Sequence, residues 1–339
     1  MAHPDFPHAA GYLNTASMGM PPGVVARAMH AAVDDWAAGR TLAPDYDEPV
    51  GRARRTWARV HGIDPAAVAI GPQVSYFVGL VAQSLPAGAQ VVTYESDFAS
   101  LTYPFLARDD LNVRQVPLEA VADAVTDQTA LVAVSAVQSS DGRVADLDAI
   151  AAAAAAHDAL TLVDTTQASG WLPIDASRFD YVACGTYKWL LAPRGTAFLA
   201  VRDAALLATL PLLAPGWYAA EQPWGMVYSP QLRMASDARR VDMSPAWLDW
   251  VGTAAALEYI EAAGVDAIHV HDLRLANELR DGLGMPPGDS AIVSVPGEGT
   301  VERLVAAGLR VGGLAGGARI CLHFYNDEDD VERVVRALG

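Results

Sequence analysis

From about residue 60 to residue 202, the chain alternates short apolar runs with longer amphipathic or alanine-rich stretches. Apolar runs that alternate with helices are typical of a mainly parallel sheet covered by helices on both faces. We therefore predict an α/β fold with strands at 67–70, 90–93, 131–137, 160–163, 181–183 and 196–201. Between and after them we predict helices at 74–84, 100–109, 147–156 and 206–210. In such a sheet, functional residues gather at the carboxyl ends of the strands.

Beyond Pro211 the sequence changes character. Residues 215–230 are rich in aromatic residues, Gly and Pro, which predicts a loop, and residues 245–263 have the apolar spacing of a long helix. The remainder mixes helical patterns with short strands. We predict a large α/β domain over residues 15–245 and a smaller α+β domain over residues 246–339 together with residues 1–14.

Composition excludes several classes of function. Of the 339 residues, 52% are apolar and 19% are charged, as in a globular protein. The formal charge of −17 disfavours a nucleic-acid partner, because phosphate backbones require a basic face. We expect a cytoplasmic protein without a membrane partner, since the sequence has neither a secretory signal nor an apolar run of membrane-spanning length. The two cysteines and eight histidines lack metal-ligand spacing, so we expect no metal site.

Lys188 and Asp164 point to the chemistry. A lysine in apolar surroundings loses its proton readily, which suits it to form a Schiff base. An acidic side chain at the end of a predicted strand is the partner that a protonated pyridine nitrogen needs. Either residue alone is more simply half of a structural ion pair, but together they indicate pyridoxal phosphate as the cofactor.

The segment Gly71-Pro72-Gln73-Val74-Ser75 follows the first predicted strand and opens a predicted helix. Backbone N–H groups at a helix start, with the hydroxyl of Ser75, can bind a phosphate group. Alone, this segment is more simply a helix cap. Beside Lys188 and Asp164, phosphate binding is the better interpretation.

The order of these motifs resembles the class V, cysteine desulfurase-like members of the fold-type I pyridoxal phosphate enzymes. The resemblance spans nearly the whole chain, from 12–17 to 325–326. Its most specific motifs are Val163-Asp164-Thr165-Thr166-Gln167, Tyr187-Lys188-Trp189-Leu190, Pro193-Arg194-Gly195, and Arg319 followed by Tyr325-Asn326. The resemblance implies a large domain with a mainly parallel, seven-stranded type of sheet and a smaller α+β domain.

The resemblance also implies three catalytic residues. Lys188 would bind the cofactor covalently and move the Cα proton of the substrate, Asp164 would pair with the pyridine nitrogen, and Gln167 would hydrogen-bond the phenolic oxygen. Phe98 would stack on the cofactor ring, and Ser139 would lie near it.

Further positions would bind the cofactor phosphate. Val74 would do so through its N–H group, Ser75 through its hydroxyl, and Tyr187 is a candidate for a further contact. Ser244 would reach the phosphate from a neighbouring subunit, which implies a homodimer with shared active sites.

Arg319, with Asn14, would bind the α-carboxylate of an amino-acid substrate, for which a guanidinium fork is suited. His323, four residues after Arg319, is an alternative candidate for substrate contact. Cys184 falls at the end of the predicted strand 181–183 and Cys321 within a further predicted strand, 319–324, so neither lies in a mobile loop. A desulfurase needs a mobile cysteine to accept sulfur, so this activity is disfavoured.

Within the family, segments 71–80, 134–139, 167–173 and 242–247 are most similar to the actinobacterial C–S lyases of ergothioneine biosynthesis. This similarity implies β-elimination from a cysteine S-conjugate sulfoxide, hercynylcysteine sulfoxide, with release of pyruvate and ammonia. The alternatives are an isopenicillin-N-epimerase-like enzyme, a cysteine desulfurase or selenocysteine lyase, and a non-catalytic relative.

Overall fold

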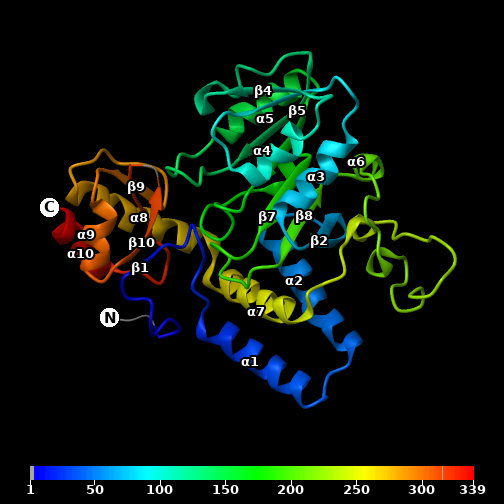
Figure 1. The fold of residues 1–339 in the computed structure, drawn as a ribbon, viewed down its shortest axis with the longest axis horizontal. Coiled ribbons are helices and arrows are strands. Elements are labelled where there is room, and N and C mark those ends of the chain that lie inside the picture. The colour runs from blue at the N-terminus through cyan, green and yellow to red at the C-terminus, as the bar shows by residue number, and fades with distance from the viewer. Residues whose placement is uncertain (1–3, 315) are drawn as a thin grey trace.

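The computed structural model describes residues 4–314 and 316–339 and confirms the α/β fold (Figure 1). Its large sheet has the strand order β2-β8-β7-β6-β5-β3-β4. Neighbouring strands are parallel except at β8, which runs antiparallel to both β2 and β7. The strands are β2 (Val68–Gly71), β3 (Gln90–Tyr94), β4 (Asn112–Val116), β5 (Thr129–Ser135), β6 (Leu160–Asp164), β7 (Tyr181–Gly185) and β8 (Ala197–Val201).

Helices cover both faces of this sheet, which explains why its inner strands are largely apolar on both faces. In β5, Leu131 and Ala133 pack in one core cluster, and Val132 and Val134 pack in another on the opposite face. Helices α3 and α4 cover the first face, whereas α2, α5 and α7 cover the second. The helices of this part are α1 (Gly23–Ala37), α2 (Asp47–Val60), α3 (Val74–Ser84), α4 (Ala99–Leu106), α5 (Leu147–Ala156), α6 (Ala204–Thr209) and α7 (Trp247–Ala263).

A second sheet, of order β1-β10-β11-β9, lies beside the first (Figure 1). It joins the two ends of the chain, because β1 pairs in parallel with β10. Its elements are β1 (Tyr12–Leu13), α8 (Val265–Gly282), β9 (Ile292–Pro296), α9 (Thr300–Ala306), β10 (Arg310–Leu314), β11 (Gly317–Cys321) and α10 (Glu328–Leu338). The exact division into domains stays a prediction. Within the described ranges, no helix combines the length and apolarity that crossing a membrane would require.

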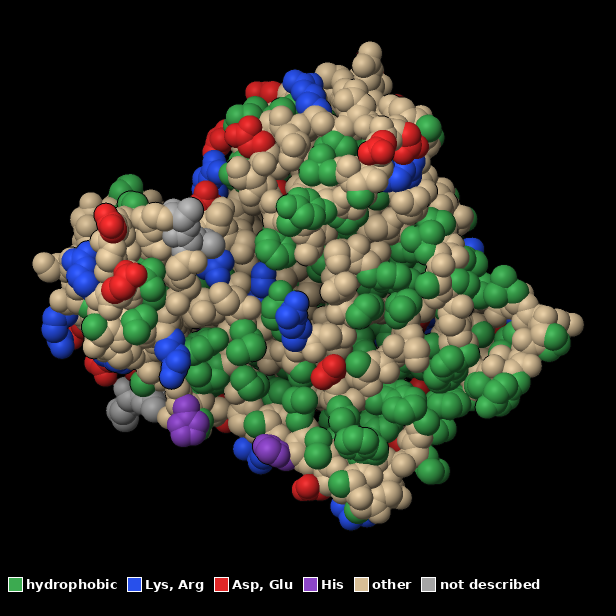
Figure 2. Space-filling model, viewed as in Figure 1, with side chains coloured by type: hydrophobic (Ala, Val, Ile, Leu, Met, Phe, Trp, Pro, Cys, Tyr) green, Lys and Arg blue, Asp and Glu red, His purple; other side chains and the backbone are tan. Residues whose placement is uncertain are grey.

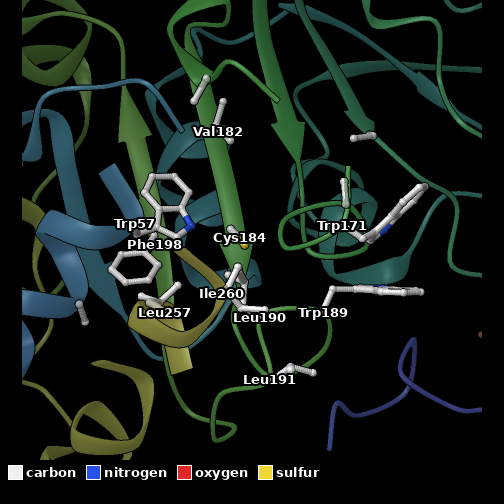
Figure 3. Packing of buried hydrophobic residues seen from close by; sticks show 14 of the residues in the cluster. Trp57, Trp171, Val182, Cys184, Trp189, Leu190, Leu191, Phe198, Leu257 and Ile260 are labelled. Carbon is white, nitrogen blue, oxygen red and sulfur yellow. The ribbon is translucent and has the colours of Figure 1, made fainter. Parts of the chain in front are cut away.

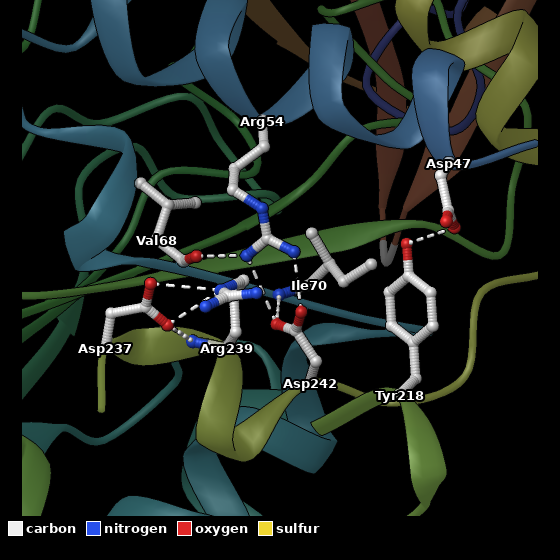
Figure 4. A network of polar contacts seen from close by, with 8 residues as sticks. All are labelled: Asp47, Arg54, Val68, Ile70, Tyr218, Asp237, Arg239 and Asp242. Carbon is white, nitrogen blue, oxygen red and sulfur yellow. Dashed lines mark hydrogen bonds and ion pairs between the residues drawn. The ribbon is translucent and has the colours of Figure 1, made fainter. Parts of the chain in front are cut away.

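A buried ion pair fixes the end of β2 (Figure 4). Nη2 of Arg54, on α2, lies 2.5 Å from Oδ2 of Asp242, and the backbone N–H of Ile70 donates to Oδ1 of Asp242 (2.8 Å). Burial raises the pKa of Asp242 to about 6, and Arg54 opposes this rise. The pair thereby ties α2, β2 and the segment before α7 together, next to the predicted phosphate loop.

Candidate active site

A cavity of about 300 Å³ lies at the carboxyl ends of β2, β5, β6 and β7. Functional residues gather at this edge of open parallel sheets, because the loops that follow the strands meet there. Eight residues predicted from the sequence line the cavity: Val74, Ser75, Phe98, Ser139, Asp164, Gln167, Tyr187 and Lys188. The fold therefore brings most of the predicted site together.

Lys188 is the only lysine in the chain, and it is 4% exposed. Its Nζ lies 5.1 Å from the ring centroid of Phe98 and 5.6 Å from that of Tyr187. Burial lowers the pKa of Lys188 to about 8; the Asp164 carboxylate opposes this shift, and the Arg319 guanidinium adds to it. The neutral amine is the nucleophilic and basic form, so these surroundings favour the form that Schiff-base chemistry requires.

Three consecutive carbonyl groups fix the turn that carries Lys188. The carbonyl of Tyr187 accepts a hydrogen bond from the N–H of Gly19 (2.8 Å), and that of Lys188 accepts one from the N–H of Leu191 (3.1 Å). The carbonyl of Trp189 accepts a hydrogen bond from the ring of His323 (3.1 Å). Gly170 packs directly against the turn, and a Cβ there would lie 2.3 Å from the Trp189 oxygen. A larger residue at Gly170 would therefore displace the turn.

Asp164 ends β6 and is buried. Its Oδ1 accepts a hydrogen bond from the backbone N–H of Thr166 (2.8 Å). Burial raises the pKa of Asp164, whereas Thr166 and the charge of Lys188 lower it, and the charge of Asp97 adds to the rise. A buried carboxylate of this kind is stabilised by a cation beside it, and a protonated pyridine nitrogen would be such a cation.

The amide of Gln167 has a fixed orientation. Its Oε1 accepts a hydrogen bond from Nε1 of Trp189 (2.8 Å), so its Nε2 points the other way. Nε2 donates to Oγ of Ser139 (2.9 Å) and to the carbonyl of Ala16 (3.0 Å). The donor end of the amide therefore lies beside Ser139 at the cavity wall, as the predicted bond to a phenolic oxygen requires.

Arg319 reaches this site from β11 in the small sheet. Nη1 donates to the carbonyl and to Oγ of Ser139 (3.1 Å to Oγ), and Nη2 donates to Oγ of Ser17 (2.7 Å). Ser17 in turn donates to Oδ1 of Asn14 (2.7 Å). A Cβ on Gly312 would lie 2.9 Å from Asn14 Oδ1 and 3.2 Å from Arg319 Nε, so glycine leaves room for both side chains. Neither Arg319 nor Asn14 lines the cavity. Arg319 contacts the cavity wall at Ser139, and Asn14 is linked to Arg319 through Ser17.

Arg194, which belongs to a motif of the resemblance but was given no role, lines the cavity together with Val74 and Ser75 at the start of α3. Ala197 in β8 pairs with Gly71 in β2 on one side and with Gly185 in β7 on the other. The segment before Ala197, which contains Arg194, therefore lies near the segments that follow Gly71 and Gly185. There the first turn of α3 has no side-chain cap, and the guanidinium of Arg194 lies 5.5 Å from the Tyr187 ring centroid. Within residues 4–314 and 316–339, no acidic side chain pairs with Arg194. An uncapped helix start and an unpaired cation fit a phosphate group.

The two thiols lie outside this site. Cys184 packs among Trp57, Trp171 and Trp189 in the core (Figure 3). Burial raises the pKa of Cys184 to about 11 and also raises the pKa of Cys321. Both thiols are fully buried, and because their pKa values are raised they are protonated at neutral pH. This agrees with the expectation that neither is a mobile nucleophile.

Two further candidates do not reach the cavity. Ser244 is exposed on the surface next to the buried Asp242, so any contact it makes with a phosphate would be in another subunit. His323 is fully buried and bonded to Asp272 and Trp189, so the alternative that it contacts substrate is wrong. In the described part of the chain, no group of three or more His, Cys, Asp or Glu residues is arranged to bind a metal.

Comparison with known proteins identifies the family. Residues 79–298 match the aminotransferase class-V family. The uncharacterized aminotransferase YcbU of Bacillus subtilis is 31% identical over 307 residues, which cover 84% of this chain and 81% of that protein. The isopenicillin N epimerase of Streptomyces clavuligerus is 26% identical over 85% of this chain and 83% of its own length.

Solved structures share the fold. A cystine C–S lyase, solved with its reaction product cysteine persulfide, superposes with a TM-score of 0.87 at 20% identity, over 98% of this chain and 97% of that chain. The cysteine desulfurase CsdA of Escherichia coli superposes with a TM-score of 0.84 at 19% identity, over 99% and 95% of the two chains. The fold is thus that of the fold-type I enzymes. The family match and the Bacillus relative show that the chain belongs to the aminotransferase class-V family of pyridoxal phosphate-dependent enzymes.

Proposed function

We propose that the protein is a C–S lyase that cleaves a cysteine S-conjugate sulfoxide by β-elimination, with hercynylcysteine sulfoxide of ergothioneine biosynthesis as the substrate. One contrast carries the proposal: Lys188 lies in the cavity with a lowered pKa, whereas neither Cys184 nor Cys321 lines it. Elimination requires a base, and persulfide formation requires a thiolate. The site therefore has the group for the first reaction and lacks the group for the second.

The cavity residues divide the work of binding. Pyridoxal phosphate, when bound, supplies an electron sink for the negative charge that develops at the substrate Cα. Lys188 would hold it covalently, Asp164 would keep its ring nitrogen protonated, and the ring would pack on Phe98. Ser75 and Arg194 would bind its phosphate beside the N-terminus of α3.

The reaction needs one base and one anion-binding group. Arg319 would orient the substrate by its α-carboxylate, and the neutral amine of Lys188 would remove the Cα proton. Breaking the Cα–H and Cβ–S bonds forms a Cα=Cβ double bond, and the sulfur departs with the bonding electron pair as a sulfenate. The released 2-aminoacrylate takes up water to give pyruvate and ammonia.

We also propose a homodimer with shared active sites. Hydrophobic side chains gather on the lower right of the face in Figure 2, where Figure 1 has α7 and the segment between α6 and α7. That segment exposes Trp224, Tyr228 and Leu232, with Tyr228 97% exposed. Such an exposed apolar surface suits contact with a second subunit. Its aromatic rings could also bind a trimethylammonium group of the substrate through cation–π contacts.

The test is product analysis on a panel of cysteine S-conjugates and their sulfoxides, with the Lys188→Ala variant as the control. The proposal expects pyruvate and ammonia from the sulfoxides, fastest from hercynylcysteine sulfoxide, and none from the control. Alanine from cysteine, with sulfide appearing only when a dithiol reductant is added to reduce the transferred sulfur, would instead identify a desulfurase. Inversion at Cα without pyruvate would identify an epimerase, as in the Streptomyces relative.

A further inference from the structure

A fully buried Asp–His pair lies behind the turn that carries Lys188. His323 follows β11, and Asp272 lies on α8. Nδ1 of His323 lies 2.8 Å from Oδ2 of Asp272, and Nε2 lies 3.1 Å from the carbonyl oxygen of Trp189, the residue after Lys188. The pair thus links the C-terminal part of the chain to the reactive lysine.

The contacts of His323 determine where its proton lies. A carbonyl oxygen can only accept, so Nε2 must carry the hydrogen that points to Trp189. One proton then remains between Nδ1 and the Asp272 carboxyl group. Burial raises the pKa of Asp272 to about 7, with His271 opposing the rise, and burial lowers that of His323 to about 3. Both directions favour a neutral pair, in which Asp272 donates to Nδ1.

The groups around the pair leave this arrangement in place. His271 Nδ1 is a further titratable contact of Asp272, at 3.0 Å from Oδ1, and it is partly exposed. The rings of Trp189 and Tyr325 flank the imidazole, at centroid distances of 5.2 and 5.5 Å. The Trp189 carbonyl therefore selects the tautomer of His323, and Asp272 holds the ring in place by donating to Nδ1.

The effect continues into the cavity through Trp189. The carbonyl of this residue is held by His323, and its indole N–H is held by Oε1 of Gln167 (2.8 Å). Because Oε1 is occupied in this way, the N–H donors of Gln167 must face Ser139 and Ala16. The position of Trp189 thus sets both the turn that bears Lys188 and the orientation of the Gln167 amide.

We infer that Asp272 and His323 are positioning residues for the reaction: through Trp189 they hold Lys188 and Gln167 in their working positions. This inference rests on the proposed function only in the role given to Lys188. It predicts that the pair acts through the single hydrogen bond from Nε2, and that a group able to replace this bond can replace the histidine.

The experiment compares His323→Leu with His323→Gln, whose amide N–H can replace Nε2–H. His323→Leu should lower kcat on the order of tenfold to a hundredfold with little change in KM, because small displacements of catalytic groups cost this much. It should also shift, by at least about half a pH unit, the pH at which the visible band of the lysine-bound cofactor changes. His323→Gln should restore both properties. If His323→Leu does not fold, His323→Asn serves, because its shorter amide can meet Asp272 but not Trp189.

A second pair of variants tests whether Asp272 donates a proton to Nδ1 of His323. Asp272→Asn can still donate to Nδ1 and should behave like the parent, whereas Asp272→Leu should behave like His323→Leu. Leu304→Ala, in the separate core of the small sheet, is the destabilising control: it should lower the Tm and leave the cofactor band and kcat unchanged. If His323→Leu and Asp272→Leu match this control, the pair is only structural and the inference fails. A missing cofactor band in the parent would instead overturn the role of Lys188.

Discussion

The pKa of Lys188 can be measured directly, because the chain contains no other lysine. The structure lowers this pKa from 10.5 to about 8, chiefly through burial. At pH 7, the neutral fraction would then be about 9% instead of about 0.03%, a gain of about 300-fold in the reactive form. Folding lowers the pKa, so the unfolded chain binds more protons between pH 8 and 10.5. The contribution of Lys188 therefore makes the folded protein more stable as the pH rises through that window.

The assay is an NMR titration of cofactor-free protein labelled with carbon-13 at lysine Cε, which gives a single lysine resonance. Two substitutions test the sign of the neighbouring charges. Arg319→Gln removes a repelling cation and should raise the pKa of Lys188, whereas Asp164→Asn removes an attracting anion and should lower it. The same protein in denaturant supplies the reference.

We predict a titration midpoint of about 8 for Lys188 in the folded protein. A folded-state midpoint at the denatured value would show that burial does not tune the amine. Shifts in the wrong direction for the two variants would show that the charges around Lys188 are arranged differently.

Two further predictions concern the surroundings of this amine, and a third compares a buried with an exposed ion pair. Asp164→Asn should retain the fold yet lose activity on the order of a hundredfold, since the charge that stabilises the cofactor ring is gone; normal turnover would make the carboxylate structural. Phe98→Ala, at a position 44% exposed, should leave the Tm nearly unchanged and weaken cofactor binding by roughly two- to tenfold in a fluorescence titration. Arg54→Met should cost about 3–5 kcal/mol in chemical denaturation by leaving a buried carboxylate unpaired. Arg59→Met, which breaks an exposed ion pair, should lower the free energy of unfolding by less than about 1 kcal/mol. Equal losses of stability in the Arg54 and Arg59 variants would contradict this prediction.

Much of the fold could be predicted because its inner strands are apolar on both faces. The predicted helices at 74–84 and 147–156 match α3 and α5. Strand β4 was not predicted, since its residues are polar and largely exposed at the edge of the sheet. Edge strands of this kind lack the apolar pattern that identifies a buried strand.

The site was predictable to the extent that it follows strand ends. Asp164 was found in this way, since loops after parallel strands converge, whereas Lys188 was found from its apolar surroundings and from the motif around it. Arg194 lay in a recognised motif, but its role could not be predicted, because its place at the cavity appears only in three dimensions. The role of His323 was also missed, since its partners Asp272 and Trp189 lie 51 and 134 residues away in sequence.

Turnover without cysteine tests the central claim most directly. The double variant Cys184→Ala, Cys321→Ser removes both thiols of the chain, each of which is buried and does not line the cavity. The account predicts that this variant releases pyruvate from a cysteine S-conjugate sulfoxide at close to the parent rate, with a modest loss of stability from repacking. A variant that folds and binds cofactor but no longer turns over would contradict the account and indicate chemistry through a cysteine.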